Sequence, residues 1–205
     1  MAIRFAIDGD LRFISHHDSM RLFERALSRA QLPVKFSEGY NPRPRLSLPV
    51  PRAVGVAGEA EIVVVGLSEP VDPKIVLSQL AEQMPASITL KDAWGLSGRQ
   101  RLYIDRVDYV VEISLELLAV VSQAVRRIMK AETWLIERSG FGDKPPKTID
   151  LRSLLLEACI DSSQLRWTVG ITQSGTIRVA EFLSAVGLDP RVFLHHVRRT
   201  AVHWR

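Results

Sequence analysis

Residues 1–95 switch repeatedly between the strand and helix periods of hydrophobicity, and this pattern constrains the fold more than any other feature of the sequence. The runs IRFAI (3–7) and AEIVVVGL (60–67) are short and apolar, as buried strands are. Alternating Leu and Ser at 46–48 and the run at 88–94 add two further strands. Apolar residues at helical spacing lie between the strands at 3–7 and 46–48, and again between the strands at 60–67 and 88–94. The predicted order, β-α-β-β-α-β, is that of a ferredoxin-like unit.

The second half of the chain predicts a similar order of elements, after a polar and basic segment at 95–106. Strand-like alternation at 109–115 leads into an amphipathic helical pattern at 117–129. We therefore expect an α+β fold of two tandem ferredoxin-like (βαββαβ) domains with antiparallel sheets, at residues 1–95 and 107–205. The remaining expected elements are strands at 134–138, 149–160, 165–172 and 194–204 and a helix at 178–186.

The first helix is predicted to begin after Ser15, whose hydroxyl suits an N-cap, and to end before Pro33. Asp18 supplies an early carboxylate that complements the helix dipole. The apolar face is expected at Met20, Phe23, Leu27 and Ala30. Three arginines lie away from that face, and we expect them to form an ordinary solvated surface: Arg21, Arg25 and Arg29.

His16, His17 and Asp18 fall in the first turn of this helix, and a His–Asp cluster can act as a general base or bind a metal. The neighbouring sequence offers no further His or Cys at ligand spacing, so we expect no metal. The positive end of the helix dipole disfavours imidazolium, which leaves a neutral His able to accept a proton. The alternative is a His that only hydrogen-bonds its own loop.

Residues 36–45, FSEGYNPRPR, form the least ordinary segment. Gly39 permits a positive φ, and two X-Pro pairs restrict the backbone to extended or turn conformations. The expected result is a semi-rigid arm that presents Tyr40, Arg43 and Arg45. An aromatic ring beside guanidinium groups suits single-stranded nucleic acid, although a structural turn with solvated arginines fits the same residues. The candidate residues for binding nucleic acid or a substrate are His16, Asp18, Arg21, Glu38, Gly39, Tyr40, Asn41, Arg43 and Arg45.

Two long motifs occur in this region, G-x-L-R-F-I-S-H-x-D-x-M-R-x-F-E-R-A-L at 9–27 and S-E-G-Y-N-P-R-P-R-L-S at 37–47. They resemble the motifs of radical SAM-linked proteins, a bacterial family. Its members often lie beside, or are fused to, a radical SAM enzyme, so the resemblance implies a radical SAM enzyme as partner. His17 departs from the family pattern, which has Leu there, and this speaks against a special role for the tandem His pair.

Two ferredoxin-like domains with an early His and an arginine-rich loop are also similar in architecture to the RAMP superfamily, which includes the CRISPR repeat-processing endonucleases. This second resemblance implies RNA cleavage as an alternative activity. The sequence has no glycine-rich loop near its C-terminus of the kind those proteins carry. Likeness of architecture alone is weak evidence of activity.

Charge and cysteine content narrow the class of protein. Residues 1–52 carry nine Lys and Arg against five Asp and Glu, which suits a local site for a polyanion. One cysteine, Cys159, allows neither an internal disulfide nor the three-cysteine motif that holds the iron–sulfur cluster of a radical SAM enzyme. The sequence has no signal-peptide pattern and no apolar run long enough to span a membrane, so we expect a cytoplasmic protein. It also has no phosphate-binding glycine loop, nucleophile elbow or zinc motif, and we expect no cofactor.

These observations favour a non-catalytic adaptor that binds RNA, or presents an RNA-linked substrate, to a radical SAM partner. One alternative is a metal-independent RNA endonuclease of RAMP type, with His16 or His17 as general base and Arg43 or Arg45 stabilising charge on the phosphate. Another is a protein-interaction module whose arm binds a partner without nucleic acid.

Overall fold

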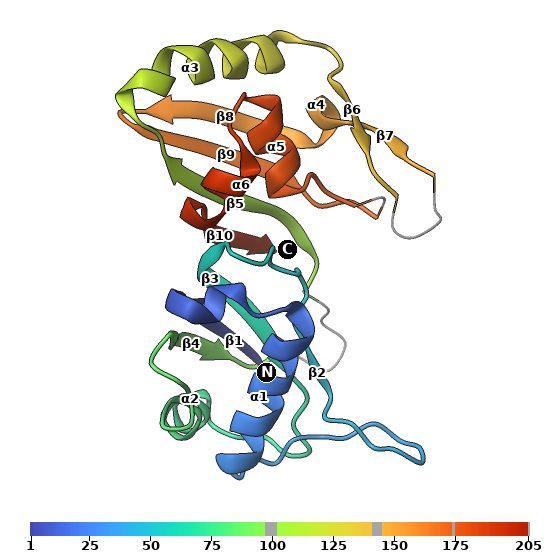
Figure 1. Cartoon of the computed structure of the whole chain (residues 1–205). Coiled ribbons are helices and arrows are strands. Elements are labelled where there is room, and N and C mark those ends of the chain that lie inside the picture. Colours follow the sequence, from blue (N-terminus) through green and yellow to red (C-terminus); the bar gives the residue numbers. More distant parts are fainter. Residues whose placement is uncertain (97–101, 141–144, 174, 205) are drawn as a thin grey trace. The chain divides into compact units, whose positions relative to one another are not determined.

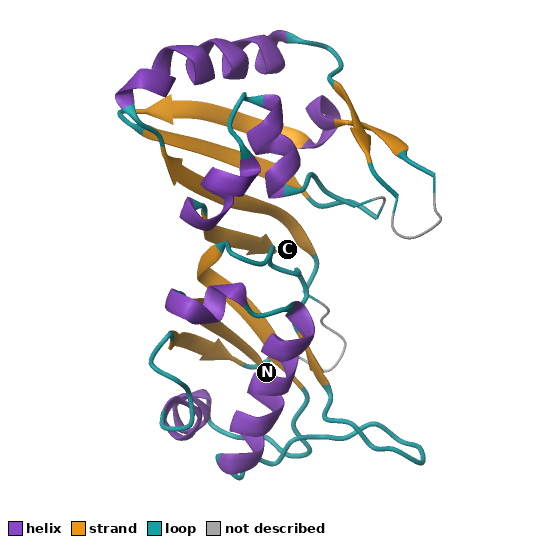
Figure 2. Cartoon of the chain, in the orientation of Figure 1, coloured by secondary structure: helices purple, strands orange, loops and turns teal. Residues whose placement is uncertain are grey.

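The chain forms two compact units, each of which contains antiparallel strand pairs and helices (Figures 1 and 2). The computed structural model describes residues 1–96, 102–140, 145–173 and 175–204. Unit 1 comprises Met1–Ile104 together with Trp204, and unit 2 comprises Asp105–His203. The expected α+β class, with a mainly antiparallel sheet, is confirmed. The predicted boundary segment includes residues 97–101, which lie outside the described residues.

In the part of unit 1 that the structure describes, two longer helices accompany the strands β1 to β4. The strand order is β4-β1-β3, and the short β2 pairs with β3. The β1–β3, β1–β4 and β2–β3 pairs are all antiparallel. The elements are β1 (Ala2–Ile7), the 3-10 helix η1 (Gly9–Phe13), α1 (His16–Arg29), β2 (Leu46–Ser47), β3 (Ala57–Val65), α2 (Pro73–Ala81) and β4 (Ile88–Trp94).

Helix α1 begins and ends where the sequence predicts. The backbone N–H of Asp18 donates to Oγ of Ser15 at 3.1 Å, which satisfies one of the free donors at the helix start. At the other end, Gln31 has a φ of 52°, the left-handed region that ends many helices. Between these ends, the buried residues of α1 are Phe23, Ala26 and Leu27.

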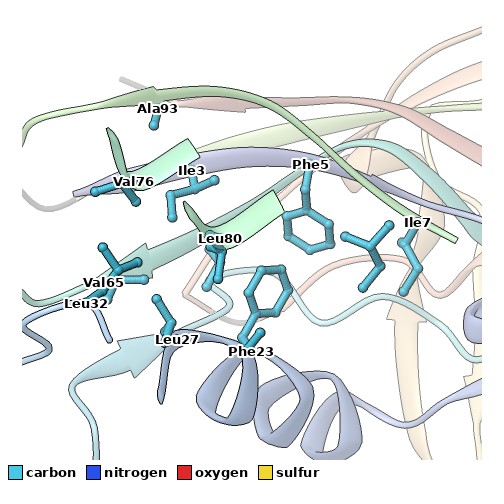
Figure 3. Packing of buried hydrophobic residues seen from close by; sticks show 13 residues of the cluster. Ile3, Phe5, Ile7, Phe23, Leu27, Leu32, Val65, Val76, Leu80 and Ala93 are labelled. Carbon is cyan, nitrogen blue, oxygen red and sulfur yellow. The ribbon is translucent and has the colours of Figure 1, made fainter. Parts of the chain in front are cut away.

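The core of unit 1 lies between the sheet and its two helices (Figure 3). Phe23 of α1 is fully buried and meets Phe5 of β1 edge to face, with 4.8 Å between the ring centroids. Leu27 packs in the same cluster, and α2 contributes Val76 and Leu80. Since both helices bury their apolar residues in one cluster, the polar face of α1 is turned away from the sheet.

The strands of unit 2 follow the order β10-β5-β9-β8, and β6 and β7 form a separate two-stranded sheet. The β5–β9, β8–β9 and β6–β7 pairs are antiparallel. Its elements are β5 (Ile104–Glu112), α3 (Leu115–Lys130), β6 (Leu135–Arg138), β7 (Lys147–Asp150), α4 (Leu151–Leu154), β8 (Leu155–Asp161), β9 (Gln164–Gly170), α5 (Val179–Ala185), α6 (Pro190–Phe193), the 3-10 helix η2 (Leu194–His196) and β10 (Arg198–Trp204).

An aromatic stack joins the sheet of unit 2 to α5. Tyr109 of β5 stacks on Trp167 of β9 at 5.3 Å between centroids, and Trp167 stacks on Phe182 of α5 at 4.8 Å. Trp167 is only 2% exposed. Nearby, Arg138 of β6 donates to both carboxylate oxygens of Glu181 in α5, and this hydrogen-bonded pair raises the pKa of Arg138.

Two predicted strands of unit 2 are wrong in part, and short polar caps explain both differences. The predicted strand at 149–160 is interrupted by α4, because the carboxylate of Asp150 accepts from the N–H of Arg152 and starts a helical turn. The predicted strand at 194–204 begins only at Arg198. Asp189 caps α6 in the same way, and the helical backbone continues through η2. In unit 1, the short 3-10 helix η1 lies between β1 and α1.

None of the helices within the described parts of the chain is long and apolar enough to cross a membrane.

The packing of α1 gives a first prediction. We expect Phe23→Ala to lower the free energy of unfolding by about 3–5 kcal/mol, because it removes a buried ring and leaves a cavity. Urea denaturation followed by circular dichroism measures this loss. Phe13→Ala is the matched control: that ring is 50% exposed, and we expect a loss below about 1 kcal/mol. Equal losses for the two variants would contradict the packing of α1 described above.

Candidate functional site

The arm, residues 35–45, is a hairpin held together at its base by backbone hydrogen bonds. Lys35 N–H donates to the carbonyl of Gly66, and Arg45 N–H donates to the carbonyl of Lys35, at 2.8 and 2.7 Å. One step further out, Ser37 N–H donates to the carbonyl of Arg43 at 2.8 Å, and Ser37 Oγ accepts from Arg43 N–H at 3.0 Å. The arm is therefore fixed to the sheet of unit 1 at its base. It connects α1 to β2 along the chain, and Figure 1 shows it extending away from that sheet.

The tip of the arm presents its side chains to solvent. Tyr40 is 99% exposed, so its ring packs against nothing in its own fold. Gly39 has a φ of +129°, which only glycine adopts without strain, and this allows the chain to reverse at the tip. A bridge between Phe36 and Pro44 adds to the restriction that the prolines impose. The other candidate residues of the arm are all exposed: Glu38, Asn41, Arg43 and Arg45.

At the start of α1, Asp18 has a structural role that its position explains. Ser15 Oγ donates to Oδ2 of Asp18 at 2.7 Å and accepts from its backbone N–H. This hydrogen bond, with the charge of Arg21 as a smaller cause, lowers the pKa of Asp18. Asp18 and Arg21 form an exposed ion pair at 3.7 Å, a type of pair that contributes little to stability. Asp18 is thus an ionised carboxylate beside the positive end of the helix.

His16 is half-buried, whereas His17 is exposed. Burial, and then the nearby charge of His17, lower the pKa of His16 from its ordinary value of 6.5. The two rings lie 6.0 Å apart. His16 is therefore neutral at neutral pH and able to accept a hydrogen bond or a proton. Among the residues that the structure describes, no three His, Cys, Asp or Glu side chains form a group that could hold a metal ion.

Arg52, which the sequence analysis did not select, organises the surroundings of His16. It lines the same small cavity as His16, together with Ser19, Leu48 and Val50. Its guanidinium donates to the carbonyls of Arg12, at 2.7 Å, and of Val56. This side chain connects η1 to the loop before β3. No periodic pattern in the sequence marks it, because the carbonyls that it binds belong to irregular backbone.

A groove of about 660 Å³ runs along the polar face of α1, between this helix and the end of α2. Arg21, Arg25 and Arg29 line it at intervals of four residues. The guanidinium of Arg29 donates to the carbonyl oxygen of Gln83 at 2.7 Å and to its side-chain oxygen at 3.3 Å. The three arginines are exposed, as the sequence predicts, and the structure adds that Glu82 to Pro85 line the other side of the groove.

The structure divides the predicted site residues among three places. Asp18 and Arg21 lie at the groove, and His16 lies in the cavity with Arg52. The arm forms the third place, and the two cavities just named are lined by residues outside 36–45.

Residues 1–179 match the bacterial protein family DUF2344, described as an uncharacterised protein conserved in bacteria. The chain belongs to this family. The match covers α1, the arm and the whole of unit 1 up to Ile104, and it ends at the first residue of α5. No curated protein matches the sequence. Since the DUF2344 description names no reaction, function has to be argued from the geometry of the sites.

The environment of His16 generates a second prediction. We expect His17→Ala to raise the pKa of His16 toward 6.5, because one cause of the lowering is removed while burial remains. Titration of the imidazole resonances by NMR measures both values. The folded state favours neutral His16, so its contribution to stability is complete above pH 6.5 and is lost as the pH falls through the lowered pKa. A wild-type pKa at or above 6.5 would contradict the burial of this ring.

Proposed function

We propose that this DUF2344 protein is a non-catalytic adaptor that binds RNA, or holds an RNA-linked substrate, for a radical SAM enzyme. The observation that carries the proposal is the ring of Tyr40, 99% exposed on a hairpin that is hydrogen-bonded at its base. An aromatic ring in this position does nothing for its own fold. It is available to a ligand that offers a flat π-face.

The exposed side chains of the arm suit single-stranded RNA. A base of a single strand can stack on Tyr40, while Arg43 and Arg45, both exposed, can each neutralise a phosphate. The hairpin base limits the motion of these side chains before binding, which lowers the entropic cost of ordering them. The positive excess within residues 1–52 adds long-range attraction for a polyanion.

The radical SAM partner is proposed from the resemblance of the two sequence motifs. The sequence carries a single cysteine, Cys159, so the three-cysteine cluster that starts radical SAM chemistry has to come from another chain or domain. In this proposal the present chain contributes binding and positioning, and the partner contributes the reaction.

We also infer that each unit is a ferredoxin-like domain. The sheet order of unit 1, β4-β1-β3 with β2 beside β3, supports this for a β-α-β-β-α-β sequence of elements. In unit 2, the same order arises if β6, β7 and α4 are an insertion, because β5, β8, β9 and β10 then correspond to the four strands.

A titration of a single-stranded RNA oligomer at several salt concentrations tests the binding function. Tyr40→Ala should weaken binding by about 1–3 kcal/mol with little change in salt dependence, because it removes stacking. Arg43→Ala and Arg45→Ala should each reduce the slope of log K against log salt by about 0.7, because each removes one phosphate contact.

Two exposed residues outside the arm serve as controls for this titration. Tyr103→Ala removes a ring that is 61% exposed, and Arg126→Ala removes one exposed charge of α3. We expect neither to change RNA binding. Melting temperatures of the arm variants should stay near the wild-type value. Unchanged RNA binding with a large loss of melting temperature would make the arm structural, and would favour the protein-interaction module.

An RNA endonuclease of RAMP type is the second candidate, and neutral His16 is the observation that favours it. In this alternative His16 takes the proton of a ribose hydroxyl. Incubation with RNA oligomers in the presence of a chelator distinguishes the two functions. Cleavage that is lost in His16→Ala would replace the adaptor with an endonuclease, whereas intact oligomers agree with the adaptor.

A further inference from the structure

The groove beside α1 carries a row of positive charge that its own fold compensates only in part. An interval of four residues corresponds to about 6 Å along a helix, so Arg21, Arg25 and Arg29 form a regular row. Like charges at this interval repel each other by roughly 0.2–0.5 kcal/mol per pair. A row of this kind is stabilised by an anion that approaches two or more of its members.

The three arginines differ in the partners that they have. Arg29 is held by Gln83 and keeps donors to spare, because a guanidinium has five N–H groups. Arg21 is paired with Asp18 only at 3.7 Å and in solvent. The guanidinium of Arg25, between them, forms no hydrogen bond or ion pair with the residues that the structure describes. An anion is therefore attracted most strongly to the middle of the row, at Arg25.

Apolar side chains line part of the groove beside the arginines, and the groove is of limited size. Leu22 of α1, Met84 and Pro85 supply hydrophobic surface next to the arginines, and Leu11 and Ile14 extend it toward η1. The volume of about 660 Å³ lies within the range of about 300–1,000 Å³ that small-molecule sites occupy. The ligand that fits has one flat apolar part and one compact anionic group.

We propose that this groove binds a nucleoside monophosphate unit, either free or as a residue of an RNA strand. The base lies against Leu22 and Met84, and the phosphate lies between Arg21 and Arg25. Guanidinium groups bind phosphate through two parallel hydrogen bonds, which suits exposed arginines on one helix face. The inference deepens the proposed function, on which it rests for the choice of a nucleotide as the ligand.

The acidic residues of the groove define its orientation. Asp18 and Glu82 line it as well, and both repel a phosphate that comes close. Asp18 competes with the ligand for Arg21, through the ion pair at 3.7 Å. The phosphate is therefore placed toward Arg25, away from Asp18. This arrangement also makes Asp18 a negative determinant of binding instead of a ligand contact.

Titration of the full chain with adenosine 5′-monophosphate, followed by NMR, tests the proposal. Arg25→Ala should weaken binding about tenfold or more, because it removes a charge-assisted contact. Asp18→Asn should tighten binding a few-fold, since the competing charge is removed. Arg126→Ala, an exposed helical arginine of unit 2, is the control and should leave the affinity unchanged. Adenosine without phosphate should bind more weakly than the monophosphate.

A tetranucleotide with a 5′-phosphate distinguishes the two sources of the ligand. If Arg25→Ala weakens both the monophosphate and the tetranucleotide, a free nucleotide suffices. If it weakens only the tetranucleotide, the groove takes a residue of RNA. Equal affinity of wild type and Arg25→Ala for both probes would overturn the inference. The proposed function would survive that result if Tyr40→Ala still weakened binding of the longer RNA, so the two failures are distinguishable.

Discussion

The burial of Phe23 and Leu27 against β1 and β3 is the contact on which the candidate sites of unit 1 depend. An amphipathic helix has one rotational setting that buries its apolar stripe, and that setting fixes every other side chain on its surface. Here it turns Arg21, Arg25 and Arg29 toward the groove and places His16 over the cavity with Arg52. Core packing thus determines the geometry of these sites.

The groove and the arm, the two candidate binding regions of unit 1, are supported in different ways. The groove is formed by side chains of α1 and by the end of α2, both of which bury residues in the core. The arm is supported by a few backbone hydrogen bonds at its base. Regions with few buried contacts open more easily than core elements do. Core packing therefore supports the shape of the groove, whereas the arm depends on the hydrogen bonds at its base.

Periodicity and capping residues predicted much of the fold. The position of α1 followed from Ser15 and Pro33, and the α+β class followed from the alternation of patterns. Sequence reasoning failed where a single carboxylate started a short helix, as Asp150 and Asp189 do. A cap of this kind starts a helical turn of only a few residues within a strand-like run. The apolar pattern of the run does not predict that turn. The assignment of the two domains as ferredoxin-like stays a prediction.

The candidate residues were predicted with less success than the elements. Tyr40 and the arm arginines are as exposed as expected, because prolines and glycine in that segment prevent packing. The groove was missed, since its second wall, Glu82 to Pro85, is far from α1 in the sequence. Arg52 was missed because its partners are backbone carbonyls. Every residue has such a carbonyl, so the residue types in the sequence do not indicate these contacts.

The fully exposed tip of the arm has a consequence for how this family can diversify. Residues that bury nothing contribute little to the free energy of folding, so most substitutions at Tyr40 or Asn41 leave the protein folded. Gly39 is the exception, because its φ of +129° excludes other residues without strain. If the arm binds a ligand as proposed, substitutions at the tip would therefore change binding more than folding. Two relatives that keep Gly39 and the arm prolines but differ at position 40 would share a scaffold and differ in what they hold.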